Sequence, residues 1–167
     1  YVPVLEKWNA EFVNLSRTRV VARKVNGRYF KEVPVPEILD QPRYFITCPK
    51  PKTNPISSMT CCLKNQFGCL PEVEKGMYHN RLDDVIADVN LAMRPDLCVV
   101  DAITGMGGIW GPAFGVPIPL KAVICSPDPV AARTTARRAS SSSASDHLSN
   151  TPAGPDAVTP SASAERT

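Results

Sequence analysis

Lysine side chains gather in the segment CPKPKTNPISSMTCCLKNQFGCLP, residues 48–71. Lys50 and Lys52 directly follow an apolar run, and Lys64 lies within residues 57–67, which we expect to form a short helix. Ammonium groups beside the exposed N–H groups of a helix N-terminus attract anions. The cluster therefore suggests a site for a carboxylate or a phosphate. The alternative interpretation is a solvated basic loop.

An imidazole and a carboxylate are the candidates for proton transfer. His79 is the only histidine of the region expected to fold, so any imidazole chemistry there would use it. Asp101 closes the apolar run 97–100. With Lys64, these side chains form the predicted catalytic set, in which His79 and Asp101 act as an acid–base or metal-coordinating pair. The alternatives are a surface or capping histidine and an aspartate that caps a turn.

A glycine-rich segment at 105–108 follows Asp101 and is expected to form the rim of the pocket. Glycine lets the backbone approach a phosphate closely, but the spacing matches neither the dinucleotide fingerprint nor the P-loop. These motifs identify no particular cofactor, and no metal ligand is assigned. The predicted ligand-binding residues are Lys50, Lys52, Thr53, Asn65, Gly105, Gly107 and Gly108.

The hydrophobic pattern predicts the elements that must position these residues. Apolar residues at helical spacing predict a helix over residues 5–15. Asn26-Gly27 lies between the β-prone runs 18–25 and 28–33, which predicts a hairpin with a two-residue turn. A short buried strand is expected at residues 44–48.

A helix with one apolar face is predicted to begin after Asn80, its expected cap, and to end at Pro95. Its spacing predicts a buried face that consists of Leu82, Val85, Ile86, Val89 and Met93. The same spacing predicts that the acidic residues are mainly exposed, namely Asp83, Asp84 and Asp88.

The apolar runs 97–100 and 122–125 predict inner strands of a covered sheet. Alternating strands and helices predict an α/β fold with a partly parallel sheet, helices packed on it, an N-terminal helix and a β-hairpin. Ligands of such sheets bind beyond the carboxyl ends of the strands. We therefore expect the lysines, His79 and Asp101 to line one pocket.

The composition changes after Ala132. Ser, Ala, Thr and Pro supply 23 of the 35 residues from 133 to 167, and such a segment buries too little apolar surface to fold. We expect residues 1–132 to form one α/β domain, a fragment of a longer one, and residues 133–167 to form a disordered tail. The alternatives are a phosphorylated or partner-binding tail around Arg137, Arg138 and residues 140–143, and a reading-frame error or gene truncation.

The chain has 167 residues, a net charge of +3 and 7% aromatic residues, and it interleaves acidic with basic residues, which disfavours nucleic-acid binding. No apolar run reaches the roughly 18 residues of a membrane span. The six cysteines lack metal-binding spacing, and Cys48, Cys98 and Cys125 fall in predicted buried strands. This favours packed thiols in a reducing, cytoplasmic location, although a targeting segment could precede residue 1.

Several motifs keep a fixed order between residues 35 and 132. They are PKPKT at 49–53, LKNQFG at 63–68, His79 with the helix RLDDVIADVNLAMRPDL after it, VVDAITGMGG at 99–108, Gly111-Pro112 and SPDPVAA at 126–132. In this order the body of the chain resembles the domain of unknown function 362 family, a group of mostly microbial proteins. The resemblance implies no established reaction, but members sometimes occur beside ferredoxin-type iron–sulfur modules.

Two departures from the family pattern stand out. Many members carry histidine where this chain has Asn54, so no imidazole is expected at that position. Members also continue with another aspartate and a helix after the DPVA segment, where this chain becomes serine-rich.

Three functions are consistent with the sequence. The first is an enzyme or binding domain for a small anionic ligand, held in the pocket of lysines, histidine and aspartate. The second is an electron-transfer accessory domain that docks a ferredoxin-like iron–sulfur partner. The third is an inactive, truncated relic. A melting temperature that rises with anion concentration would favour the binding domain. Iron–sulfur absorbance in a co-purified partner would favour the accessory domain, and failure to fold would favour the relic.

Overall fold

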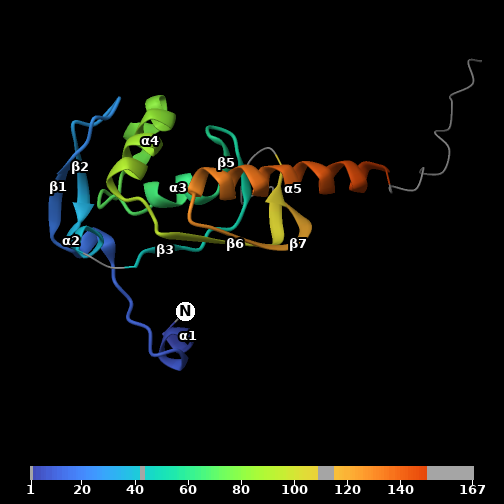
Figure 1. The fold of residues 1–167 in the computed structure, drawn as a ribbon, viewed down its shortest axis with the longest axis horizontal. Coiled ribbons are helices and arrows are strands. Elements are labelled where there is room, and N and C mark those ends of the chain that lie inside the picture. The colour runs from blue at the N-terminus through green and yellow to red at the C-terminus, as the bar shows by residue number, and fades with distance from the viewer. Residues whose placement is uncertain (1, 42–43, 109–114, 150–167) are drawn as a thin grey trace, which may run out of the picture.

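The computed structural model describes residues 2–41, 44–108 and 115–149, with side chains described as far as residue 141. It contains a five-stranded sheet, a separate two-stranded sheet and helices packed on both (Figure 1). The larger sheet combines parallel and antiparallel pairs, so the predicted α/β fold with a partly parallel sheet is confirmed. No helix in these ranges has the length and apolar character needed to cross a membrane.

Strand β6 (Leu97–Gly107) is the centre of the larger sheet. β3 (Ile46–Thr47) and β4 (Lys52–Asn54) pair with it in parallel, and β7 (Val116–Ser126) pairs with it in antiparallel fashion. β5 (Ser58–Thr60) extends the sheet from β4. Strands are therefore present where the runs 44–48, 97–100 and 122–125 predicted them, and β6 and β7 are much longer than those runs.

One face of β6 is covered by helices. α3 (Cys62–Phe67) and α5 (Pro129–Ser149) contact each other, and α5 contacts both β6 and β7 (Figure 1). Cys98, Val100 and Ala102 alternate along β6 and are fully buried beneath these helices. Residues 57–67 thus form β5 followed by a six-residue helix rather than one continuous helix.

The opposite face of β6 and β7 is open. Ile103 of β6 and Val123 of β7 are more than half exposed. Cys48 and Cys125 are exposed as well, so the prediction that they are buried packing residues is wrong, whereas Cys98 is buried as expected. A sheet covered on one face alternates between buried and exposed side chains, which short apolar runs do not reveal.

The predicted hairpin forms, but its turn differs from the prediction. β1 (Val20–Lys24) and β2 (Glu32–Pro36) pair in antiparallel fashion, and they are joined by residues 25–31 rather than by a two-residue Asn-Gly turn. The loop is wide because it wraps around the carboxylate of Asp88. A Cβ atom on Gly27 would lie 2.4 Å from Oδ2 of Asp88, so only glycine fits this approach.

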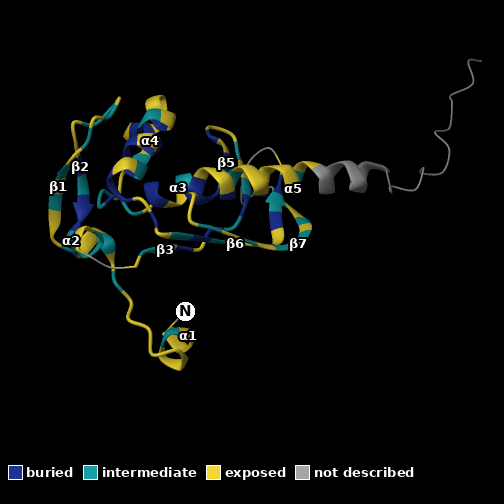
Figure 2. Ribbon diagram, in the orientation of Figure 1, coloured by how far each residue is buried: buried dark blue, intermediate teal, exposed yellow. Residues whose placement is uncertain are grey.

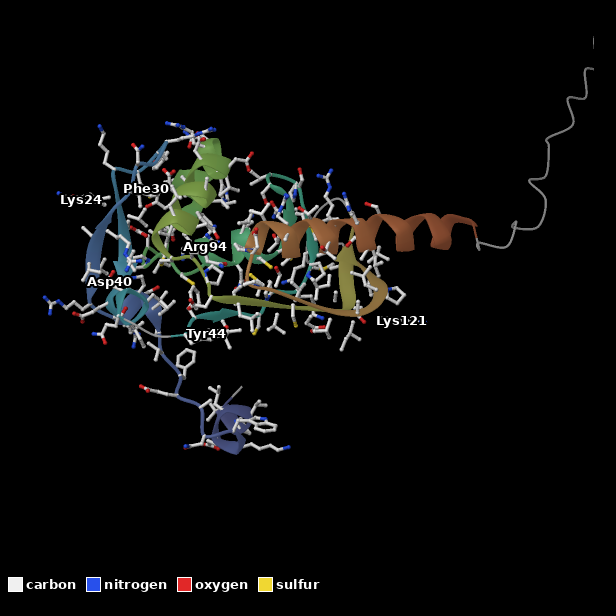
Figure 3. All side chains as sticks on the ribbon, viewed as in Figure 1. Lys24, Phe30, Asp40, Tyr44, Arg94 and Lys121 are labelled. Atoms are coloured by element: carbon white, nitrogen blue, oxygen red, sulfur yellow. The ribbon has the colours of Figure 1, made fainter. Side chains whose placement is uncertain are left out.

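Asp88 is buried, with 1% of its surface exposed, so the prediction that it is exposed is wrong. Its Oδ1 accepts a hydrogen bond from the N–H of Arg28 at 3.0 Å. Its Oδ2 accepts from the N–H groups of Tyr29 at 2.7 Å and Phe30 at 2.8 Å. Phe30 then lies next to α4 and its ring packs against Tyr78 at 5.7 Å between centroids (Figure 3).

α4 (Leu82–Ala92) presents the apolar face that its periodicity predicted. All five predicted core residues are at most 8% exposed, namely Leu82, Val85, Ile86, Val89 and Met93. Asp83 is exposed and Asp84 half-buried. The helix begins after Arg81 without a side-chain cap. Asn80 lies instead in the 3-10 helix Lys75–Arg81, so the capping prediction is wrong.

The N-terminal helix is shorter than predicted. α1 covers Val2–Lys7 and ends before Asn9, which adopts a positive φ of 49°. Trp8 and Phe12, two residues of the expected apolar face, are 72% and 74% exposed. Figure 2 shows α1 almost entirely in the exposed colour. A second short 3-10 helix, Leu15–Arg17, and helix α2 (Glu37–Asp40) complete this end of the fold.

Helix α5 extends into the segment that the composition predicted to be disordered. Residues 133–149 are helical, and Ala136 is buried with Ala132 against the sheet. Two alanines at a spacing of four let the helix approach the strands closely. The expected disorder therefore does not begin at residue 133, and residues 150–167 lie outside the described residues.

Candidate anion-binding site

Lys50 and Asp101 form an ion pair on the open face of the sheet. The ammonium Nζ lies 2.7 Å from Oδ2 of Asp101 and also donates to the carbonyl oxygen of Thr104 at 2.9 Å. The hydrogen bond from Lys50 and a second one from the N–H of Ile103 lower the pKa of Asp101 below its ordinary value. Asp101 lies in the middle of β6 and not at its end, and its carboxylate is ionised and paired.

The other predicted residues line different cavities. Lys64 lies with Arg133 and Asp83 at a cavity of about 310 Å³, and burial lowers the pKa of its ammonium group. His79 lies with Asp83 and Asp84 at another, of about 350 Å³. Lys64, His79 and Asp101 therefore do not line one common cavity, although the cavities of Lys64 and His79 share Asp83, and their catalytic roles stay predictions.

One cavity does collect many of the predicted ligand-binding residues. It has a volume of about 400 Å³ and lies where β4, β5 and the end of β6 meet α5. Predicted residues in its lining are Lys52, Thr53, Gly105, Gly107 and Gly108. The remaining lining residues are Ser58, Met59, Met106, Ile118, Arg137, Ser140 and Ser141. Five of the seven residues assigned to ligand binding thus share one cavity.

The charges around this cavity all have the same sign. Lys52 comes from β4 and Arg137 from α5, and no aspartate or glutamate belongs to the lining. Two cations facing one concave space give a positive potential that attracts an anion. We call this space the β4–α5 cavity. Lys52 and Arg137 are its only ionisable lining residues within the part of the chain that the structure describes.

The glycines of the cavity have a structural reason that the sequence did not show. Residues 105 and 107 belong to β6 rather than to a loop, so the prediction of a glycine-rich loop is wrong. A Cβ on Gly107 would lie 2.5 Å from Cδ1 of Ile118, and one on Gly105 would lie 2.9 Å from Cδ1 of Leu120. Glycine is needed at both positions because the side chains of Ile118 and Leu120 of β7 lie over the backbone of β6.

Gly108 and Thr53 close the end of the cavity. Gly108 has a φ of 103°, a backbone conformation that glycine adopts readily. Its carbonyl oxygen accepts a hydrogen bond from Oγ1 of Thr53 at 2.5 Å. This bond ties β4 to the residue that directly follows β6, beside Lys52, the neighbour of Thr53.

Two asparagines near the cavity form hydrogen bonds that stabilise the local fold. Asn65 donates from Nδ2 to Oγ1 of Thr47 at 2.7 Å, which holds α3 against β3, and it does not line the cavity. Oδ1 of Asn54 accepts hydrogen bonds from the N–H groups of Ile56 and Ser57. Asn54 therefore shapes the turn between β4 and β5.

Three buried cysteines lie beneath α5. The sulfur atoms of Cys61 and Cys62 are 3.8 Å apart, and Cys98 belongs to the same cluster. The hydrogen bond from Cys62 lowers the pKa of Cys61, and the same bond raises the pKa of Cys62. All six cysteines are free thiols in the structure. Among the described residues, no group of three histidine, cysteine or acidic side chains is placed to hold a metal ion.

Arg137 is a functional candidate that the sequence suggests only as part of a possible partner-binding tail and not as part of the anion site. Its neighbours are serine, alanine and threonine, a composition that predicts a disordered segment. The available signal was the helix start: Oδ1 of Asp128 accepts from the N–H groups of Val130 and Ala131, as a capping residue does. Alanines four residues apart then continue the covered face as far as Ala136.

The chain forms an α/β domain whose sheet is partly parallel and carries helices on one face. A cavity lined by two cations at the edge of the sheet is its candidate anion site. The chain belongs to the family described as Domain of unknown function (DUF362), which matches residues 1–137. This confirms the resemblance seen in the sequence. The association with iron–sulfur modules stays a prediction.

A curated relative is the thylakoid-associated protein sll1697 of Synechocystis sp. (strain ATCC 27184 / PCC 6803 / Kazusa), which is 33% identical over 90 residues. These residues make up 50% of this chain and 28% of the relative, so the chain matches well under two thirds of that protein. No solved structure matches the chain.

Proposed function

We propose that this domain binds a small anionic ligand in the β4–α5 cavity. The observation that carries the proposal is that Lys52 and Arg137 face one space whose lining, among the described residues, contains no acidic side chain. Lys50, by contrast, is already neutralised by Asp101 at 2.7 Å.

Binding, rather than catalysis, is what the geometry supports. Acid–base catalysis requires a donor or acceptor within hydrogen-bond reach of the reacting group. His79 and Lys64 line other cavities, and within the part of the chain whose side chains are described the β4–α5 cavity is lined by no histidine and no carboxylate. Docking of a ferredoxin-like partner and loss of activity both stay predictions, and the same holds for a cytoplasmic location.

The test is a titration of the full chain with inorganic phosphate and with acetate, followed by the shift in melting temperature. Hydrogen bonds to charged groups contribute about 1.5–3 kcal/mol, so Lys52→Gln or Arg137→Gln should each weaken binding roughly tenfold or more. Arg138→Gln is the matched control, since Arg138 is exposed on the same helix and does not line this cavity. Equal affinities for Arg137→Gln and Arg138→Gln would contradict the proposal.

A further inference from the structure

We propose that the ligand of the β4–α5 cavity is an amphiphile, with one oxyanionic head and an apolar body. This inference rests on the proposed function and specifies its ligand class. It follows from three features of the cavity. Most of its hydroxyl groups already donate hydrogen bonds to the protein backbone, apolar side chains form much of its wall, and its volume exceeds that of a small ion.

Three of the four hydroxyl groups in the lining already donate their hydrogen atoms to the protein backbone. Oγ1 of Thr53 donates to Gly108, Oγ of Ser140 to Ala136 at 2.8 Å, and Oγ of Ser141 to Arg137 at 3.0 Å. A hydroxyl has one hydrogen to give. Donors for an oxyanion therefore come mainly from Lys52 and Arg137, which suits a single charged head.

Apolar side chains from three strands form the rest of the wall. Met59 comes from β5, Met106 from β6 and Ile118 from β7, and all three line the cavity. The Cδ1 atom of Ile118 lies over Gly107, where any side chain would displace it. Methionine side chains are flexible and adapt to apolar ligands of different shape. This wall favours hydrocarbon over a hydroxylated body.

The volume also exceeds what an inorganic anion fills. The cavity measures about 400 Å³, within the range of roughly 300–1,000 Å³ typical of sites for organic ligands. An acetate or phosphate ion would leave water against Met59, Met106 and Ile118. A longer apolar chain would displace that water, and each methylene group so buried should tighten binding about fourfold.

The experiment is a calorimetric titration of the full chain with acetate, butanoate, hexanoate and octanoate, together with inorganic phosphate and 1-octanol. We expect octanoate to bind at least about 100-fold more tightly than acetate, because several methylene groups leave water. We expect 1-octanol, which has the same body without the charge, to bind much more weakly than octanoate. Vesicles of phosphatidylglycerol serve as a second arm, and we expect the chain not to sediment with them.

Two variants separate the head from the body. Arg137→Gln should weaken all four carboxylates by a similar factor. Met106→Gln should weaken octanoate far more than acetate and so reduce the dependence on chain length. Met77→Gln is the control for Met106→Gln. Met77 is 64% exposed and lies in the 3-10 helix Lys75–Arg81, outside β6.

The outcomes distinguish the two proposals. If acetate and phosphate bind as tightly as octanoate and still depend on Arg137, the anion site stands and the amphiphile is wrong. If octanoate binds and Arg137→Gln has no effect, both are wrong. Binding to vesicles without binding to octanoate would also overturn the inference, since the ligand would then be a membrane surface.

Discussion

Replacement of Asp88 by alanine should destabilise the fold strongly, although Asp88 belongs to no candidate site. Its carboxylate accepts three backbone hydrogen bonds from the loop between β1 and β2, and it is 1% exposed. A buried N–H without an acceptor costs about 1–3 kcal/mol. Arg28 is exposed, so part of the loop can turn to water, and we expect a total of about 3–5 kcal/mol.

Asp83→Ala is the matched control for Asp88→Ala. Asp83 lies on the same helix, but it is exposed, and its loss removes only a favourable charge near the helix N-terminus. We expect it to cost less than about 1 kcal/mol. Urea unfolding followed by circular dichroism measures both variants. Equal unfolding midpoints would refute the reasoning, because the buried carboxylate would then contribute no more than the exposed one.

The pH dependence of stability gives a second readout of Asp88. Burial opposes ionisation of this carboxyl group, but the three N–H groups outweigh it, so its pKa in the folded state is lowered. A lowered pKa means that the unfolded chain binds the proton more tightly. The stabilisation is therefore complete above the unfolded pKa, near 3.9, and is lost as the pH falls through the lower folded pKa. Asp88→Asn should remove this acid-dependent part of the unfolding free energy.

Further substitutions test the remaining parts of the fold. Ile86→Ala should cost about 2–5 kcal/mol in urea unfolding, and Leu91→Ala, at a 63% exposed position of the same helix, well under half of that; similar costs would show that the helix faces are wrong. Gly107→Ala should lower stability by about 1–3 kcal/mol because its Cβ would meet Ile118, whereas Gly76→Ala, with nothing within 4 Å, should not. Ala136→Asp should lower stability by about 3–5 kcal/mol, and an unchanged melting temperature would show that α5 does not pack on the sheet.

Local periodicity was sufficient to predict α4 and its buried face. Residues at a spacing of three and four share one side of a helix wherever the helix packs, so the positions of Val85, Ile86 and Val89 needed no knowledge of the partner. The proximity of Lys50 and Asp101 was predictable for a similar reason. β3 and β6 pair in parallel with Thr47 beside Cys98, so Lys50 and Asp101, each three positions further along, lie side by side near the middle of β6 rather than at two strand ends.

Asp88 could not be placed from the sequence. Its partners are backbone N–H groups 58–60 positions earlier in the chain, and no side-chain pattern records such a contact. The Asn26-Gly27 pair was misleading for the same reason. Asn-Gly favours a tight turn in isolation, but the carboxylate of Asp88 holds Gly27 in a wider loop.

The cavity was only half predictable. Lys52 and Thr53 are predictable as site residues because they follow an apolar run. The composition around Arg137 instead predicts a disordered tail. Composition predicts disorder when large apolar residues are few, yet a helix that packs through Ala132 and Ala136 needs none on its covered face. The sequence does not reveal the helix that completes the cavity, because alanines on its covered face produce only a weak hydrophobic pattern.

The two buried clusters differ in when the growing chain completes them. The cluster around α4 and β2 has its buried residues between Val33 and Met93, with partly buried neighbours from Val21 onward. The cluster beneath α5 joins Met59 to Cys98 and to Ala136, and hence needs a helix made much later. During synthesis the first cluster can therefore close while the sheet still exposes the face that α5 will cover. Cys98 and Val100 therefore lie uncovered until the residues of α5 have been added to the chain.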